Sequence, residues 1–172
     1  CMSIAVCSGS FDPVTSGHVD IFERASRMFD TLIVGVFQNI NKQYFFSVDE
    51  RTALLQEATK HIGNLQVTSF DGLLPDYMHS VGASVVIRGL RSVTDFEYER
   101  NEAQLIKRIA PDIETVFLLS RPELSYVSSS GVKELARFHG EITGLVPACV
   151  ETAVRKRQTE LENCSIHAVK SI

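Results

Sequence analysis

The sequence predicts a single α/β domain whose five-stranded parallel sheet carries helices on both faces. Short apolar segments, typical of buried strands, alternate along the chain with longer segments whose apolar residues recur at helical spacing. At 172 residues, of which 44% are hydrophobic and 22% charged, the chain suits one domain with a full hydrophobic core. No repeat or linker interrupts this pattern, so we assign residues 2–160 to the domain and residues 161–172, which show little pattern, to a C-terminal tail.

The first half of the chain predicts three strands, each followed by a helix. The strands are expected at residues 3–7, 31–37 and 65–70. The helices that follow them are expected at residues 17–30, 48–60 and 74–81. Ser47 and Glu50 stand three positions apart at the start of the second helix, which is the pattern of a capping box.

The second half continues the alternation with two more strands. They are expected at residues 84–87 and 114–119, with helices at 95–108, 131–138 and 147–157. Strands that alternate with helices pair in parallel through right-handed crossovers, so their carboxyl ends meet at one edge of the sheet. This is a Rossmann-like arrangement, in which ligands bind at that edge.

The turn at residues 8–18 is the first candidate site at that edge. Gly9 allows the backbone to approach a ligand closely, and Pro13 prevents the helix from starting early. His18 then falls in the first helical turn, where unpaired N–H groups and the helix dipole favour an anion. The sequence contains neither of the usual glycine-rich phosphate loops, G-x-x-x-x-G-K-[ST] and G-x-G-x-x-G.

A plain structural interpretation of this turn competes with the functional one. Turns with Gly and Pro follow the first strand of many α/β domains, and a histidine at a helix start is usually a solvated cap. We favour the functional interpretation because Ser10 and His18 both fall at the edge of the sheet where ligands bind.

Three later segments reach the same edge. Lys42 lies in the loop after the second strand, and Arg88 and Arg91 follow the fourth, where two guanidinium groups form a compact anion-binding pair. Ser128–Ser130 precede a helix and expose hydroxyl and N–H groups. The competing interpretations are that the arginines pair with the acidic residues of segment 95–99 and that the serines only cap the helix.

Charge and cysteine content exclude several other classes of protein. A net charge of −4 and a sequence pI of about 5.7 provide no field for holding a nucleic acid. Cys1, Cys7, Cys149 and Cys164 are scattered without metal-ligand spacing, so we expect free thiols. Without a signal peptide or an apolar run of about 18 residues, a soluble cytoplasmic protein is expected. Met2 is expected to be the initiator, which leaves Cys1 outside the domain.

Together these motifs identify a resemblance. Gly9–Pro13 followed by Thr15–His18 resembles the signature of the [HT]-x-G-H nucleotidylyltransferase superfamily. With Lys42, segment 88–91, segment 95–99 and segment 127–130 added in order, the chain resembles the bacterial phosphopantetheine adenylyltransferase family. The resemblance covers roughly Ile4 to Arg157.

The resemblance implies transfer of an adenylyl group from ATP to 4′-phosphopantetheine, giving dephospho-coenzyme A and pyrophosphate in coenzyme A synthesis. It also implies a Mg²⁺ requirement, a homohexamer and coenzyme A as a feedback ligand. The implied ATP-side residues are Ser10, Phe11, His18, Gly89, Leu90, Arg91, Glu99, Leu124, Ser125, Tyr126, Val127, Ser128, Ser129 and Ser130. The implied phosphopantetheine-side residues are Ser10, Lys42, Leu74 and Arg88.

The chemistry implied by the resemblance needs no general base, because the acceptor phosphate is already an anionic nucleophile. His18 would donate to the α-phosphate of ATP during in-line attack, and Arg91 would help to hold the ATP phosphates. Lys42 and Ser10 would fix the nucleophilic phosphate. Mg²⁺ would bridge phosphate oxygens with water in its shell, so we expect no metal ligands from the protein itself.

Two other functions stay open at this point. The first is another activity of the superfamily, such as a nicotinamide mononucleotide adenylyltransferase or a cytidylyltransferase, against which segments 88–91 and 95–99 speak. The second is a nucleotide-sensing module without catalysis, which predicts loss of His18, Lys42 or Arg91. All three residues are present.

Overall fold

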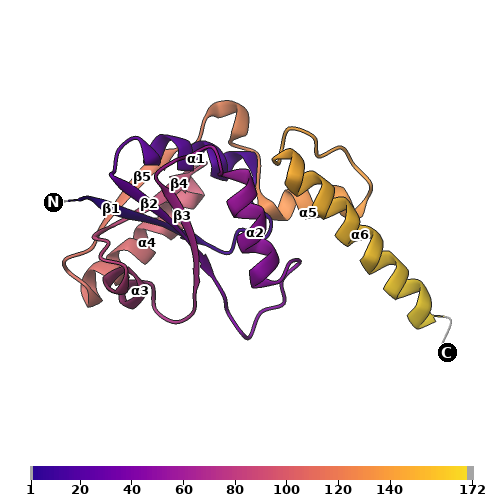
Figure 1. Cartoon of the computed structure of the whole chain (residues 1–172), viewed down its shortest axis with the longest axis horizontal. Coiled ribbons are helices and arrows are strands. Elements are labelled where there is room, and N and C mark those ends of the chain that lie inside the picture. The colour runs from indigo at the N-terminus through magenta and orange to yellow at the C-terminus, as the bar shows by residue number, and fades with distance from the viewer. Residues whose placement is uncertain (1, 170–172) are drawn as a thin grey trace.

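A computed structural model describes residues 2–169 of the chain, and it confirms the predicted parallel sheet (Figure 1). The strands pair in parallel in the order β3-β2-β1-β4-β5. They are β1 (Ile4–Gly9), β2 (Thr31–Phe37), β3 (Leu65–Phe70), β4 (Val85–Leu90) and β5 (Glu114–Leu119). The first strand therefore lies at the centre of the sheet, with β2 on one side and β4 on the other.

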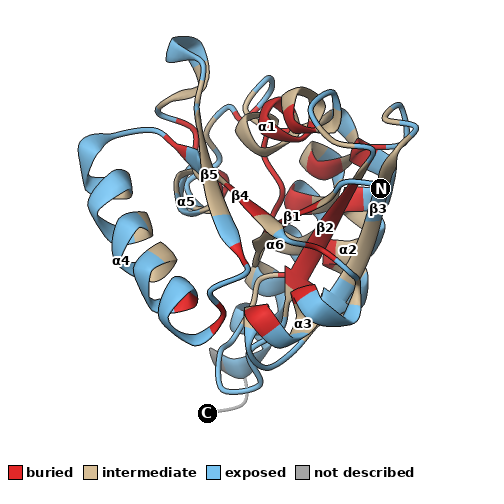
Figure 2. Ribbon diagram, turned by 90° about the vertical axis from the view of Figure 1, so that its left-hand side faces the viewer, coloured by how far each residue is buried: buried red, intermediate tan, exposed pale blue. Residues whose placement is uncertain are grey.

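The central strands are buried (Figure 2). Alternate residues along them belong to hydrophobic clusters on opposite faces of the sheet. Ala5 and Cys7 of β1 belong to one hydrophobic cluster, whereas Val6 between them belongs to the other. The edge strands β3 and β5 are only partly buried. This burial on two sides explains why residues 31–37 read as a nearly continuous apolar run.

Helices cover both faces, as predicted. Their bounds are α1 (Ser16–Ser26), α2 (Val48–Ala58), α3 (Leu74–Ser80), α4 (Val93–Ile109), α5 (Ser129–Arg137) and α6 (Ala148–Val169). Residues of α1, α2, α5 and α6 contribute to the larger cluster, and residues of α3 and α4 contribute to the smaller cluster on the opposite face. A short 3₁₀ turn, η1 (Pro122–Leu124), connects β5 to α5.

Helix starts follow the capping signals in the sequence. The Ser47 hydroxyl accepts the Glu50 N–H at 3.2 Å and the Glu50 carboxylate accepts the Ser47 N–H at 3.4 Å, which confirms the capping box of α2. Ser92 caps α4 and Ser128 caps α5 in the same way, each accepting an N–H three residues later. These local bonds fix where the chain turns from the sheet edge into a helix.

Several elements differ from their predicted bounds. β1 extends to Gly9, α1 already ends at Ser26, α4 begins at Val93, and α5 begins at Ser129, so that Ser129 and Ser130 belong to the helix instead of preceding it. β4 and α6 extend furthest beyond their predicted ends. β4 continues through Leu90, because Arg88–Leu90 pair with Phe117–Leu119 of β5, so Arg88 belongs to the strand instead of following it. α6 does not end at Arg157 but continues through the expected tail to Val169, and Figure 1 shows it extending away from the sheet. Residues 170–172 of the tail, together with Cys1, lie outside the described residues.

The structure describes three of the four cysteines. Cys7, Cys149 and Cys164 are free thiols, as predicted. Within residues 2–169, no helix combines the length and the apolar character that a membrane span requires.

Replacing Leu55 of α2 by Ala should lower the free energy of unfolding by about 2–5 kcal/mol, because its side chain is 0% exposed in the larger cluster. Urea unfolding followed by circular dichroism measures this change. Leu73→Ala is the control, since that side chain is 61% exposed and its loss should cost less than about 0.5 kcal/mol. Equal losses in both variants would contradict the assigned core.

Candidate active site

A cavity of about 410 Å³ opens at the carboxyl ends of β1 and β4. These two strands flank the point where the strand order reverses, which is where open α/β sheets bind ligands. The cavity is lined by residues from the turn after β1, from α1, from β4 and the start of α4, and from the segment that leads into α5. The edge predicted from the sequence is therefore hollowed into a cavity.

His18 is held by a capping box of its own at the start of α1. Thr15 is the residue that caps the helix, and its hydroxyl accepts the His18 N–H at 3.3 Å. In return, the backbone N–H of Thr15 donates to Nδ1 of His18 at 3.0 Å. The histidine occupies the position that a Glu or Gln takes in an ordinary capping box.

This bond decides the protonation of the imidazole. A backbone N–H can only donate, so Nδ1 must be an unprotonated acceptor and the ring proton must sit on Nε2. Burial lowers the pKa of His18 to about 4, and the positive charge of Arg91 adds to that shift. His18 is therefore a neutral imidazole at pH 7, with one N–H donor left for a ligand.

Phe11 shapes the turn beneath the histidine. It adopts a left-handed backbone conformation with φ of 48°, which is rare for a residue other than glycine. Its ring packs edge-on against the His18 ring, with centroids 5.0 Å apart. A Cβ at Gly9 would lie 3.2 Å from that ring, so the glycine allows this close packing.

The two arginines of segment 88–91 line the cavity from β4 and from the residue that follows it. Arg88 donates to the Ser8 carbonyl at 3.0 Å and pairs with Glu99 at 3.4 Å. Arg91 pairs with Asp95 at 3.1 Å and donates to the Val127 carbonyl at 3.2 Å. The arginines therefore pair with acidic residues, as the competing interpretation expected, and also line the cavity, as predicted.

Glu99 differs from an ordinary surface carboxylate. Burial raises the pKa of Glu99, while the charge of Arg88 acts in the opposite direction. Because the carboxylate is half-buried beside Arg88, it orients that guanidinium at the cavity wall.

The serine segment connects the start of α5 to the turn after β1. Ser128 caps α5 by accepting the Gly131 N–H at 3.0 Å. The Ser129 hydroxyl donates to the Pro13 carbonyl at 2.7 Å, which joins two walls of the cavity. The N-terminus of α5 and the residues Ser128–Ser130 therefore line the same cavity as His18.

The structure places most of the predicted site residues around this cavity. Those in its lining are Ser10, Phe11, His18, Lys42, Arg88, Gly89, Arg91, Glu99, Leu124, Val127, Ser128, Ser129 and Ser130. Four predicted residues, Leu74, Leu90, Ser125 and Tyr126, are not in the lining. Leu74 packs against the smaller hydrophobic cluster, and the Tyr126 side chain is 73% exposed. Their roles stay predictions.

Sequence reasoning missed three residues of this site. Asp12 is buried and accepts the N–H groups of Phe45 and Phe46, while Thr15 orients His18. Lys133 lines the cavity, with Nζ 3.7 Å from Asp12. A signal for Lys133 was present, because it stands four residues after Ser129 and so lies on the same face of α5.

The carboxylates of the cavity already have partners. Asp12 accepts two backbone N–H groups, while Asp95 and Glu99 pair with the arginines. Within residues 2–169 no group of three or more His, Cys, Asp or Glu side chains is arranged to hold a metal ion. This donor set fits an ion carried by the phosphates of a nucleotide better than one held by the protein.

The fold and the cavity place the chain in a class. The family model described as cytidylyltransferase-like matches residues 6–135, from β1 into α5. A crystal structure from Vibrio parahaemolyticus, assigned as a nicotinate-nucleotide adenylyltransferase, superposes with a TM-score of 0.69 over 92% of this chain and 95% of that one. Its identity is 16%, so it shows a shared fold only. The class is that of the cytidylyltransferase-like proteins.

Closer relatives give the particular family. A phosphopantetheine adenylyltransferase of Clostridium botulinum (strain Eklund 17B / Type B) is 49% identical over 156 residues, covering 91% of this chain and 98% of the relative. Those of Roseiflexus castenholzii and Syntrophomonas wolfei are 49% and 46% identical, covering 90% and 91% of this chain and 97% of each relative. The chain belongs to the phosphopantetheine adenylyltransferase family.

Nitrogen-detected NMR of histidine-labelled protein should find His18 neutral, with its proton on Nε2, at pH 5.5. An ordinary histidine is about nine-tenths protonated at that pH. Since the folded pKa of about 4 lies below the ordinary value of 6.5, the unfolded chain takes up the proton first as the pH falls. Acidification between these values should thus destabilise the wild type more than His18→Gln. A titration midpoint near 6.5 would refute the assignment.

Proposed function

We propose that this protein transfers an adenylyl group from ATP to the phosphate of 4′-phosphopantetheine, giving dephospho-coenzyme A and pyrophosphate, a step of coenzyme A biosynthesis. The observation that carries the proposal is the identity of 46–49% over nine-tenths of the chain with proteins named for this activity. The cavity supports it, because its walls offer hydrogen-bond donors and cations suited to phosphate groups.

Direct attack by the acceptor phosphate suits the groups present. A phosphate that is already an anion needs no general base, so the site must mainly hold two polyanions in line and neutralise the charge that develops. The neutral His18 cannot act as a cation, but its Nε2–H can donate to a nonbridging oxygen of the α-phosphate. Thr15 keeps that donor in the correct tautomer by occupying Nδ1.

We assign the two substrates to the two sides of His18. The ATP phosphates would lie against Arg91 and the N-terminus of α5, where Ser128–Ser130 expose N–H and hydroxyl groups. The acceptor phosphate would lie against Ser10, Lys42 and Arg88 on the other side. Attack on the α-phosphate then forms the new P–O bond as the bond to pyrophosphate breaks, and His18 stands between the two.

We also propose that the reaction requires Mg²⁺. It would be held through ATP phosphate oxygens that Arg91 and Ser129 in turn position, and it would supply charge neutralisation as pyrophosphate leaves. We further propose a homohexamer in the cytoplasm with coenzyme A as a feedback ligand. These last properties are supported only by membership of the family.

Pyrophosphate release from ATP should require both 4′-phosphopantetheine and Mg²⁺. The measurement is a coupled pyrophosphate assay, with nicotinamide mononucleotide as the alternative acceptor and chelation by EDTA as the metal control. Release with nicotinamide mononucleotide instead would favour another nucleotidylyltransferase activity. Binding of ATP without release to either acceptor would favour a nucleotide-sensing role.

His18→Ala should lower kcat by a factor of about 10²–10³, which is the usual cost of removing one hydrogen-bond donor to an oxygen that becomes more negative in the transition state. The KM for ATP should change little, because the donor acts mainly as the charge develops. His61→Ala is a matched control, since that histidine is exposed and pairs with Glu23 away from the cavity. A kcat within tenfold of the wild type would remove His18 from the reaction.

A further inference from the structure

The loop that carries Lys42 has an exposed part and a part anchored in the domain. It connects β2 to α2, and its residues 38–43 are exposed, whereas Tyr44–Phe46 are partly or fully buried. Lys42 is the cation that we assign to the acceptor phosphate, and it stands two residues before the anchored part. The position of its ammonium group therefore depends on how Tyr44–Phe46 are held.

Two side chains hold the anchored part from inside the domain. The Asp12 carboxylate accepts the Phe45 N–H at 2.7 Å and the Phe46 N–H at 2.8 Å. Arg51 of α2 donates to the Phe46 carbonyl at 3.2 Å and lies 3.9 Å from the centre of the Tyr44 ring. Lys42 also lies near this ring, with Nζ 5.4 Å from the ring centre.

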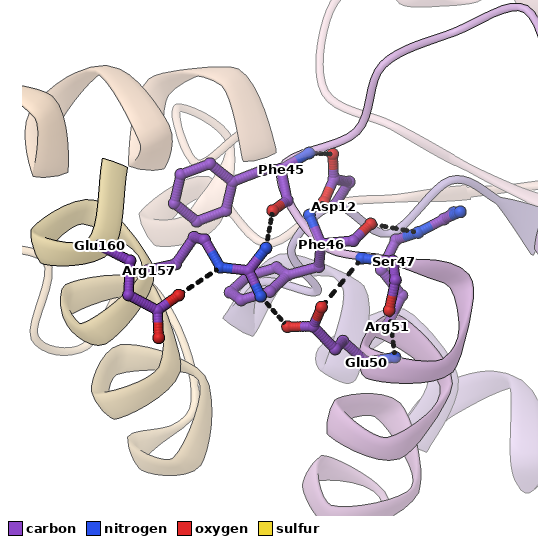
Figure 3. A network of polar contacts seen from close by, with 8 residues as sticks. All are labelled: Asp12, Phe45, Phe46, Ser47, Glu50, Arg51, Arg157 and Glu160. Atoms are coloured by element: carbon purple, nitrogen blue, oxygen red, sulfur yellow. Dashed lines mark hydrogen bonds and ion pairs between the residues drawn. The ribbon is translucent and has the colours of Figure 1, made fainter. Parts of the chain in front are cut away.

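A third side chain reaches the same segment from the C-terminal helix (Figure 3). Arg157 of α6 donates through Nη1 to the Phe45 carbonyl at 3.0 Å. The rest of its guanidinium is oriented by Glu50, which accepts from Nη2, and by Glu160, 3.1 Å from Nε. The hydrogen bond to Arg157 lowers the pKa of Glu50, so the pair stays charged.

Phe45 is thus held at both of its backbone polar groups. The Phe45 N–H donates to Asp12, which lies in the turn that also carries His18, and the Phe45 carbonyl accepts from Arg157. Arg157 itself does not line the cavity. Its direct contacts with the loop are the Phe45 carbonyl and the Phe46 ring, whose centre lies 5.4 Å from its guanidinium carbon.

We infer that Arg157 is a positioning residue for Lys42, through which helix α6 sets the acceptor side of the site. The inference rests on the proposed function for the identity of the acceptor. Loss of the Arg157 bond would free the Phe45 carbonyl and let the loop move, and displacements of about 1 Å can cost large factors in a reaction that depends on position.

The kinetic test compares two arginines on one helix. Arg157→Gln should raise the KM for 4′-phosphopantetheine on the order of tenfold and leave the KM for ATP within about twofold. Arg155→Gln is the matched control, because Arg155 pairs with Glu141 and Glu151 and not with the loop. Arg157→Lys keeps a charged donor and should recover part of the loss.

A double-mutant cycle asks whether the effect passes through Lys42. In the Lys42→Ala background, Arg157→Gln should raise the acceptor KM by less than about twofold, because the group that it positions is gone. If Arg157→Gln raises the acceptor KM by the same factor with and without Lys42, the inference is overturned. So would equal changes in both KM values, which indicate a merely structural role.

Limited trypsin digestion gives a readout that does not depend on activity. Cleavage after Lys42, followed by mass spectrometry on the folded full chain, should be several times faster in Arg157→Gln than in the wild type and unchanged in Arg155→Gln. Unchanged cleavage in Arg157→Gln would overturn the anchoring. If the wild type shows no phosphopantetheine-dependent release, the proposed function fails, while faster cleavage still supports the anchoring.

Discussion

The pairing of β1 with β2 on one side and β4 on the other is the constraint on which the rest of the structure depends. All three strands run in parallel, so the segments that follow them leave from the same edge of the sheet. The turn with His18, the loop with Lys42 and the segment with Arg91 therefore converge although they are far apart in the chain. The cavity lies where these segments meet, together with the segment that follows β5.

Several polar groups around the site are held by hydrogen bonds within the protein. Arg51 is almost fully buried, and its Nε and Nη1 donate to the carbonyls of Ser10, Phe37 and Phe46, while Nη2 has no hydrogen-bond partner among the described residues. A buried guanidinium is tolerated only with such partners. Through these bonds it connects the turn after β1 to the end of β2 and to the anchored part of the Lys42 loop.

Much of the fold was predictable because its signals are local. Residues 31–37 form a strand as expected, and the Ser47 capping box is present with both of its bonds. The errors occur where neighbours in space decide. β4 continues through Arg88 because residues 88–90 pair with β5. α6 continues past Arg157, although among its described side chains Val154 is the last buried apolar residue and no apolar stripe beyond it predicts a helix.

By itself, the sequence determined the strand order along the chain, the position of the turns and the residue types available for binding phosphate. Only the tertiary structure decided that Lys133 faces Asp12 and that Arg157 holds the Phe45 carbonyl. The physical reason is the distance along the chain over which each kind of signal acts. Periodicity and caps act over a few residues, whereas Phe45 and Arg157 stand 112 residues apart and meet only after α6 packs against α2 and α5.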